Sequence, residues 1–239
     1  MTIKKNIHVI LLWGAITNTG SAQIKLHITT GFTSPVSDFY SSVLVEADRR
    51  MSDVSISFEV LPAERSLVLV DEGVNDAECC RAPEVLIKEY KNLIPIDVSF
   101  FSVRFSVFSK NKDISIKSFE NLKPYSIGTV KGWKLAVIKL KEVEPAETHV
   151  VTTPAQLFKM LDQDRVDYGV VGYLSGLKVI SQFKFDSIHA IQPPLIEKPL
   201  FLILNKKHKN LIPRFNQVFN EMKTDGTIDR LYKDVVDSL

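Results

Sequence analysis

Basic and aromatic side chains stand at two points where a predicted strand ends, and both points could bind an anion. Arg81 directly follows a strand predicted over 76–80, and a guanidinium there could fork onto a carboxylate or a phosphate. Lys131, Gly132 and Trp133 open a predicted helix. Unpaired N–H groups at such a start favour an anion, glycine permits close backbone approach, and the indole could stack on a ligand ring.

Each of these positions also has a purely structural interpretation, which the sequence leaves open. Arg81 could form an ion pair with Glu78 or Glu84, and Trp133 could be a core residue between helix and sheet. Arg65, at the start of a predicted helix, could bind a ligand, but it could equally be a solvated charge or a brace between two parts of the fold.

Patterns that indicate catalysis or metal binding fail on spacing. Ser175 in the run 172–176 lies one place too late for a nucleophile elbow, and the run 128–134 lacks the spacing and the Ser or Thr of a phosphate loop. The five histidines are scattered without metal-ligand spacing. We therefore expect no cofactor, no metal and no catalytic residue, with Glu78 the one carboxylate near a candidate site.

The first 22 residues have the order of a secretory signal. A basic start precedes an apolar run over 7–16 that is too short for a membrane anchor, and small residues lead to Gln23 as the expected new N-terminus. A buried first strand or helix is the alternative. Without this segment the chain carries 28 basic and 28 acidic residues, and it shows no basic stripe with interleaved aromatics, so nucleic acid is not an expected partner.

The two cysteines, Cys79 and Cys80, are adjacent. Neighbours in sequence rarely form a disulfide because the ring that closes is strained, so we expect two small buried residues at the end of a strand. A reactive pair of thiols is the alternative.

Short apolar runs alternate with helical patterns, which predicts mainly parallel sheets covered by helices. The order β-α-β-α-β occurs in the first sixty residues after the leader and recurs after residue 124, so two α/β lobes are expected. Ligands in such sheets bind at the carboxyl ends of the strands. The three residues that follow the first strand are Gly31, Phe32 and Thr33, and they would line the floor of a cleft there. The predicted strands are 24–30, 54–60, 76–80, 98–109, 125–130, 149–151, 166–171, 187–191 and 200–204, and the predicted helices are 36–51, 62–70, 133–140, 154–161, 172–180, 210–222 and 227–236.

Four short motifs, in order, resemble those of the periplasmic solute-binding proteins of the amino-acid-binding type (family 3). They are the runs 72–76, 126–132, 164–171 and 222–228, which resemble "G-x-x-D", "V-G-V-x-x-G", "G-R-V-D-A-V-V" and "L-K-A-D-G-T-I". The resemblance implies the type II two-lobed fold, with lobe 1 over 23–101 plus 195–239, lobe 2 over 102–194 and two hinge strands. It also matches Phe100 and Phe101 to an aromatic pair at the hinge, one packing and one facing the cleft.

The chain departs from this family where the family binds its ligand. The Arg that grips the ligand carboxylate should fall near Lys88, and the accompanying Thr near Pro83. The acid that holds the ligand ammonium should fall at Gly172, which Tyr173 follows, and both are kept as candidate ligand-binding residues. The residues therefore indicate a divergent branch that binds common amino acids poorly.

These observations together predict a monomeric, periplasmic solute-binding protein. It would trap a small polar or anionic ligand between its lobes and pass it to a membrane ABC transporter or a sensor. An enzyme on the same scaffold, of a dehydratase-like kind, and a signalling or interaction protein without a ligand are the alternatives.

Overall fold

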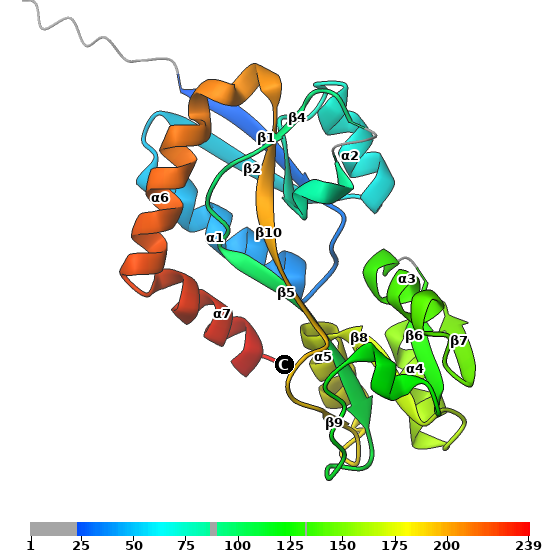
Figure 1. The fold of residues 1–239 in the computed structure, drawn as a ribbon. Coiled ribbons are helices and arrows are strands. Elements are labelled where there is room, and N and C mark those ends of the chain that lie inside the picture. The colour runs from blue at the N-terminus through cyan, green and yellow to red at the C-terminus, as the bar shows by residue number, and fades with distance from the viewer. Residues whose placement is uncertain (1–22, 87–89, 132) are drawn as a thin grey trace, which may run out of the picture.

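The computed structural model describes residues 23–86, 90–131 and 133–239 of the 239-residue chain, so the expected signal peptide over 1–22 lies outside the described residues. The described residues form ten strands, which run through two lobes (Figure 1). In the first lobe the order is β2-β1-β3-β10, with β4 on β10. These strands are β1 (Ile24–Thr30), β2 (Val54–Val60), β3 (Ala77–Arg81), β4 (Leu93–Pro95) and β10 (Ile196–Asn205).

Helices cover both faces of this first sheet. Three of them, α1 (Val36–Arg50), α6 (Ile212–Thr224) and α7 (Thr227–Asp237), pack together on one face, and α2 (Ala63–Asp71) packs on the other (Figure 1). The buried apolar residues of α1 are Val36, Phe39, Tyr40, Val43, Leu44 and Ala47. Their spacing of three and four residues forms the stripe that faces the sheet.

The second lobe repeats the α/β pattern on the strand order β5-β8-β6-β7, with β9 on β5. Its strands are β5 (Phe101–Ser109), β6 (Ser126–Val130), β7 (Glu147–Val151), β8 (Tyr168–Gly172) and β9 (His189–Ala190), and its helices are α3 (Lys134–Val143), α4 (Pro154–Asp162) and α5 (Tyr173–Phe183). Strands β7, β6 and β8 are parallel, as βα units require. Short 3₁₀ turns lie at Pro83–Val85, Phe119–Leu122 and Lys206–Leu211.

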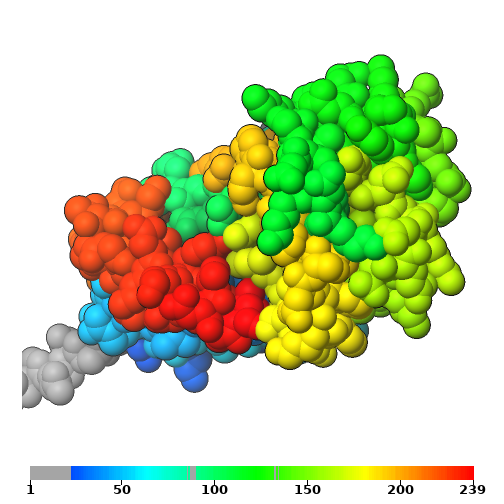
Figure 2. Space-filling model, turned by 90° about the horizontal axis from the view of Figure 1, so that it is seen from below, coloured from blue at the N-terminus to red at the C-terminus, as the bar shows by residue number. Residues whose placement is uncertain are grey.

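Two antiparallel strands connect the lobes. β5 and β10 pair from Phe101 opposite Leu200 to Phe105 opposite Ile196, and each strand then continues into a different sheet. The lobes also touch directly, because Lys178 Nζ on α5 donates a hydrogen bond to Ser34 Oγ at 2.7 Å. Figure 2 shows α7, in red, against the yellow part of the second lobe. None of the described helices has the length and apolarity to cross a membrane.

Local side-chain and backbone features set the ends of several elements. The Thr153 side chain caps α4 by accepting a hydrogen bond from the Gln156 backbone N–H, and Gly73 ends the α2 segment with a φ of +77°. Strands β1 and β2 have the predicted bounds and α7 begins at the predicted residue, whereas the helix predicted from residue 210 begins at Ile212, since residues 206–211 form a 3₁₀ turn before α6. The two-lobed α/β architecture is therefore confirmed.

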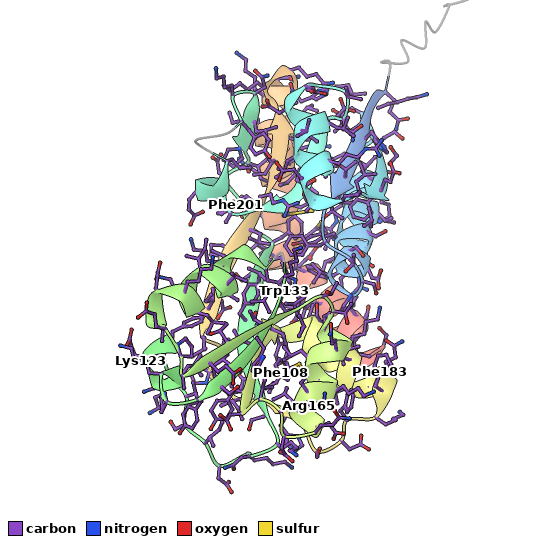
Figure 3. The ribbon with its side chains drawn as sticks, turned by 90° about the vertical axis from the view of Figure 1, so that its right-hand side faces the viewer. Phe108, Lys123, Trp133, Arg165, Phe183 and Phe201 are labelled. Atoms are coloured by element: carbon purple, nitrogen blue, oxygen red, sulfur yellow. A yellow bond between two sulfur atoms is a disulfide. The ribbon has the colours of Figure 1, made fainter. Side chains whose placement is uncertain are left out.

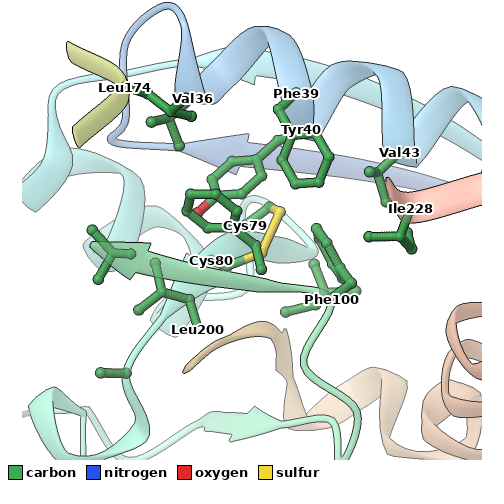
Figure 4. Close-up of a cluster of buried hydrophobic side chains, with 14 of the residues drawn as sticks. Val36, Phe39, Tyr40, Val43, Cys79, Cys80, Phe100, Leu174, Leu200 and Ile228 are labelled. Carbon is green, nitrogen blue, oxygen red and sulfur yellow. A yellow bond between two sulfur atoms is a disulfide. The ribbon is translucent and has the colours of Figure 1, made fainter. Parts of the chain in front are cut away.

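The prediction for the cysteines was wrong on the bond. Cys79 and Cys80 are fully buried, as expected for small residues at a strand end, but the two sulfurs are joined in a disulfide. Figure 4 shows this disulfide packed beside Tyr40 and Phe100 in the core of the first lobe. Adjacent cysteines do not cross-link distant parts of the chain, so the sulfurs contribute to the core as apolar packing.

Candidate functional site

A cavity of about 60 Å³ lies where the lobes and the connecting strands meet. The first lobe contributes Phe32 from the β1–α1 connection, Val36 at the start of α1 and Tyr232 from α7. The second lobe contributes Trp133 and the first turn of α5, residues 172–175. Strand β5 supplies residues 101–105 between them. A space built from two lobes and their connection is a common location for a small-molecule site.

The charged group in this lining is Arg104 on β5. Its guanidinium carbon lies 4.9 Å from the centroid of the Tyr173 ring and 5.4 Å from that of Tyr232, so both rings make cation–π contacts with it. Arg104 Nη2 also donates a hydrogen bond to the Tyr232 hydroxyl. Burial raises the pKa of Tyr232 while the Arg104 charge opposes that shift, so the hydroxyl stays protonated at neutral pH.

Trp133 lies at the waist of the molecule, between the two halves (Figure 3). Its indole is half-buried and meets the Phe105 ring edge to face, with centroids 5.7 Å apart. Gly172 ends β8 beside it, and a Cβ at this glycine would stand 3.8 Å from the indole. The structure therefore places Trp133, Gly172 and Tyr173 around one cavity, although the predicted helix start is one residue later, at Lys134.

Arg81 has the structural partner that the sequence left open. Its Nη2 lies 2.7 Å from Glu78 Oε1, and its guanidinium also stacks 5.5 Å from the centroid of the Phe32 ring. Residues three apart on a regular strand face opposite sides. Here the register between β3 and β10 shifts, so Cys79 and Cys80 lie opposite one residue, Leu202. This bulge turns Glu78 and Arg81 to the same side.

The Glu78 carboxylate is fully buried and enclosed by donors. The Gly31 backbone N–H donates to Oε1 at 3.2 Å, and the Ser66 hydroxyl donates to Oε2. Burial raises the pKa of Glu78 to about 7, although Arg81, Ser66 and Gly31 all act to lower it. Nearby, the buried Tyr40 hydroxyl has no hydrogen-bond partner among the described residues, and burial raises its pKa well above the ordinary value.

The other predicted site residues divide between the cavity, the core and the surface. Phe32 and Phe101 line the cavity, whereas Phe100 packs against Phe39 and Phe219 inside the first lobe. Lys131 and Arg65 are exposed and do not line the cavity, and neither does Arg81. Gly132 and Lys88 lie outside the described residues.

Sequence reasoning missed Arg104, Tyr232 and Ser175 as neighbours of one site. Arg104 carried a usable signal, because it is the one charged residue in the mostly apolar strand predicted over 98–109. Tyr232 carried none, since its helix is distant in sequence and only the fold brings it to β5. Within the described part of the chain, no cluster of three or more metal-ligating side chains occurs.

Known structures of low sequence identity share this architecture. The unliganded, open L-cystine solute receptor of Neisseria gonorrhoeae aligns with a TM-score of 0.70 at 16% identity, over 90% of this chain and 94% of that one. A histidine kinase sensor domain with similarity to periplasmic binding proteins aligns at 0.69 and 11%, over 89% and 96%. An ancestral arginine-binding protein bound to glutamine aligns at 0.65 and 20%, over 88% and 96%. The chain has the type II periplasmic binding protein fold.

No protein-family model matches the sequence, and no curated protein matches it either. This combination of a clear type II fold and a distant sequence agrees with a divergent branch. In this type II fold the cavity lies between the lobes, and Arg104 rather than Arg81 is the cation that lines it.

Proposed function

We propose that this chain is an extracytoplasmic solute-binding protein, which captures a small ligand between its lobes and delivers it to a membrane ABC transporter or a sensor. The observation that carries the proposal is the cavity, because both lobes and their connecting strands contribute to its lining. Solved structures with this fold include a solute receptor and a kinase sensor domain, which supports both kinds of partner. The chain would act as a monomer in the periplasm after removal of residues 1–22.

The proposal divides the chain into lobe 1 over 23–101 plus 195–239 and lobe 2 over 102–194. The antiparallel pairing of β5 with β10 supports a hinge near these boundaries. Closure of the lobes about this hinge would enclose the ligand.

The surroundings of Glu78 support a binding protein rather than an enzyme. A general acid or base must reach the reacting group. Glu78 instead bonds to Ser66, Gly31 and Arg81, and it does not line the cavity. Its surroundings therefore support a structural role, and the dehydratase-like alternative has no carboxylate in the cavity lining among the described residues.

The test is a thermal-shift screen of the full chain against a metabolite panel, followed by calorimetry and small-angle scattering with each hit. A ligand should raise the melting temperature and make the particle more compact. Gly172→Trp should abolish both effects, because φ and ψ at this position (−59° and 129°) suit any residue and the added ring would fill the cavity. Gly172→Ala is the matched control and should bind normally. A hit that binds Gly172→Trp unchanged would place the ligand elsewhere and refute the proposal.

A further inference from the structure

The charge of the cavity has one sign. Among the described residues that line it, Arg104 is charged and none is acidic. An acid that could neutralise Arg104 is Glu197, which lies opposite it in the β5–β10 ladder. Glu197 is exposed and does not line the cavity, although its charge acts on the Tyr232 hydroxyl. The site therefore offers a cation to a ligand without offering an anion.

Arg104 is positioned by aromatic rings, so most of its hydrogen-bonding capacity is unused. A guanidinium has five N–H donors in a planar fork. In the described part of the chain the Arg104 guanidinium donates a hydrogen bond to the Tyr232 hydroxyl, while Tyr173 and Tyr232 contact the charge through their ring faces. Ring contacts hold the plane of the guanidinium without occupying its N–H groups. A carboxylate, which accepts two parallel N–H bonds, fits this arrangement.

The remaining wall is mostly apolar. Side chains from both lobes and from β5 form it, and they are Phe32, Val36, Phe101, Val103, Phe105, Trp133 and Leu174. An ammonium group enclosed there would lose its hydration without meeting a carboxylate, and burying an unpaired charge is strongly unfavourable. The volume of about 60 Å³ has room for several water-sized groups, since one water needs roughly 10–15 Å³ on the same measure.

We infer that the ligand is a small monocarboxylate with an apolar body and no amino group, whose carboxylate binds Arg104 while its body packs against Trp133 and Phe32. This inference rests on the proposed function and names the substrate class of the same cavity. Amino acids and amines are excluded as ligands because the described lining of the cavity has no acidic side chain to pair with an ammonium group. Inorganic phosphate and sulfate are excluded because the rest of the wall is mostly apolar.

The experiment is calorimetry on the full chain with probes matched in shape. Propionate, isobutyrate and benzoate are the carboxylates, propionamide and benzamide are their uncharged analogues, and alanine, benzylamine and phosphate complete the set. We expect at least one carboxylate to bind, and its amide to bind at least tenfold more weakly. Arg104→Gln should weaken the carboxylate at least tenfold, and Arg104→Lys should recover part of the loss because it restores the charge without the fork.

Arg165→Gln is the matched control, because Arg165 is exposed on the second lobe, away from Trp133 in Figure 3, and should leave binding unchanged. Circular dichroism must show that Arg104→Gln remains folded. If Arg104→Gln unfolds, the comparison of each carboxylate with its amide on the wild-type chain decides the inference alone. Binding of amines or amino acids in preference to carboxylates, or of none of these probes, would overturn the inference. The metabolite screen described above then decides the proposed function separately.

Discussion

Replacing Glu78 with Gln should stabilise the protein at alkaline pH, even though the change removes a buried ion pair. Breaking such a pair often costs several kcal/mol because the remaining charge is left unpaired. Here burial raises the pKa of Glu78 to about 7, which means that desolvation of the carboxylate outweighs the attraction of Arg81. The introduced glutamine would mimic the protonated acid, with its carbonyl oxygen toward Gly31 and its amide nitrogen toward the Ser66 oxygen.

The size of the effect follows from proton linkage. The folded carboxyl has a pKa of about 7 against an ordinary 4.5, so the folded state binds the proton more tightly than the unfolded state. The contribution of Glu78 to stability is therefore fully present below about pH 4.5 and is lost as pH rises to about 7. At 1.36 kcal/mol per pKa unit the loss is about 3 kcal/mol, so Glu78→Gln should match the wild type at pH 4 and exceed it by up to about 3 kcal/mol at pH 8.

Urea unfolding of both proteins from pH 4 to pH 8 measures this difference. Comparing the variant with the wild type removes the opposite slopes of groups such as Glu46 and Asp225, whose pKa values are lowered to about 2 in both proteins. Glu142→Gln is the control, because Glu142 pairs with Lys139 at the surface and should change stability little at any pH. A Glu78→Gln variant that is most destabilised at pH 8 would show that the ion pair is net stabilising and would refute the reasoning.

Three further results are expected. Gly176→Ala should lower the free energy of unfolding by about 1–3 kcal/mol in urea titrations, because the added Cβ would stand 2.2 Å from the Phe108 ring. An unchanged urea midpoint would contradict this tight packing. Trp133→Ala should weaken the binding of a ligand in the cavity roughly thirtyfold by calorimetry, since truncating a buried anchor costs on the order of 2 kcal/mol of binding free energy. Folding should change little, and normal binding would show that Trp133 is not part of the site. N-terminal sequencing of exported protein should begin near Gln23, and an intact Met1 would count against the signal peptide.

Most of the fold could be predicted from hydrophobic periodicity and from turn residues. The helices predicted over 36–51 and 154–161 depend on local features, the apolar stripe of α1 and the Thr153 cap of α4, so one sequence was enough to predict them. The motif runs added the lobe order, which periodicity alone could not supply. Errors occurred at ends of elements and at β3, where a bulge that depends on pairing with β10 has no local signal.

The site was only half predictable because it is assembled from distant segments. The strand-end rule proposed Trp133, the expected position of the family's acid proposed Gly172 and Tyr173, and all three line the same cavity. The strand-end rule also favoured Arg81, whose charge the bulge instead turns toward Glu78. Arg104 lies within a strand rather than at its end, so the rule passed over it.

The position of Arg104 has a mechanical consequence. It stands in the short ladder that joins the lobes, and sliding β5 along β10 would break the hydrogen bonds from Phe101 to Phe105, whereas bending the two-stranded ribbon preserves them. Any rotation of one lobe against the other therefore has this ribbon near its axis, where displacements are smallest. The cavity residues contributed by the two lobes would move, while Arg104 would stay almost in place. Under the proposed function, a ligand would first meet this fixed charge in a salt-sensitive encounter, and its enclosure between the lobes would be a separate step that salt affects less.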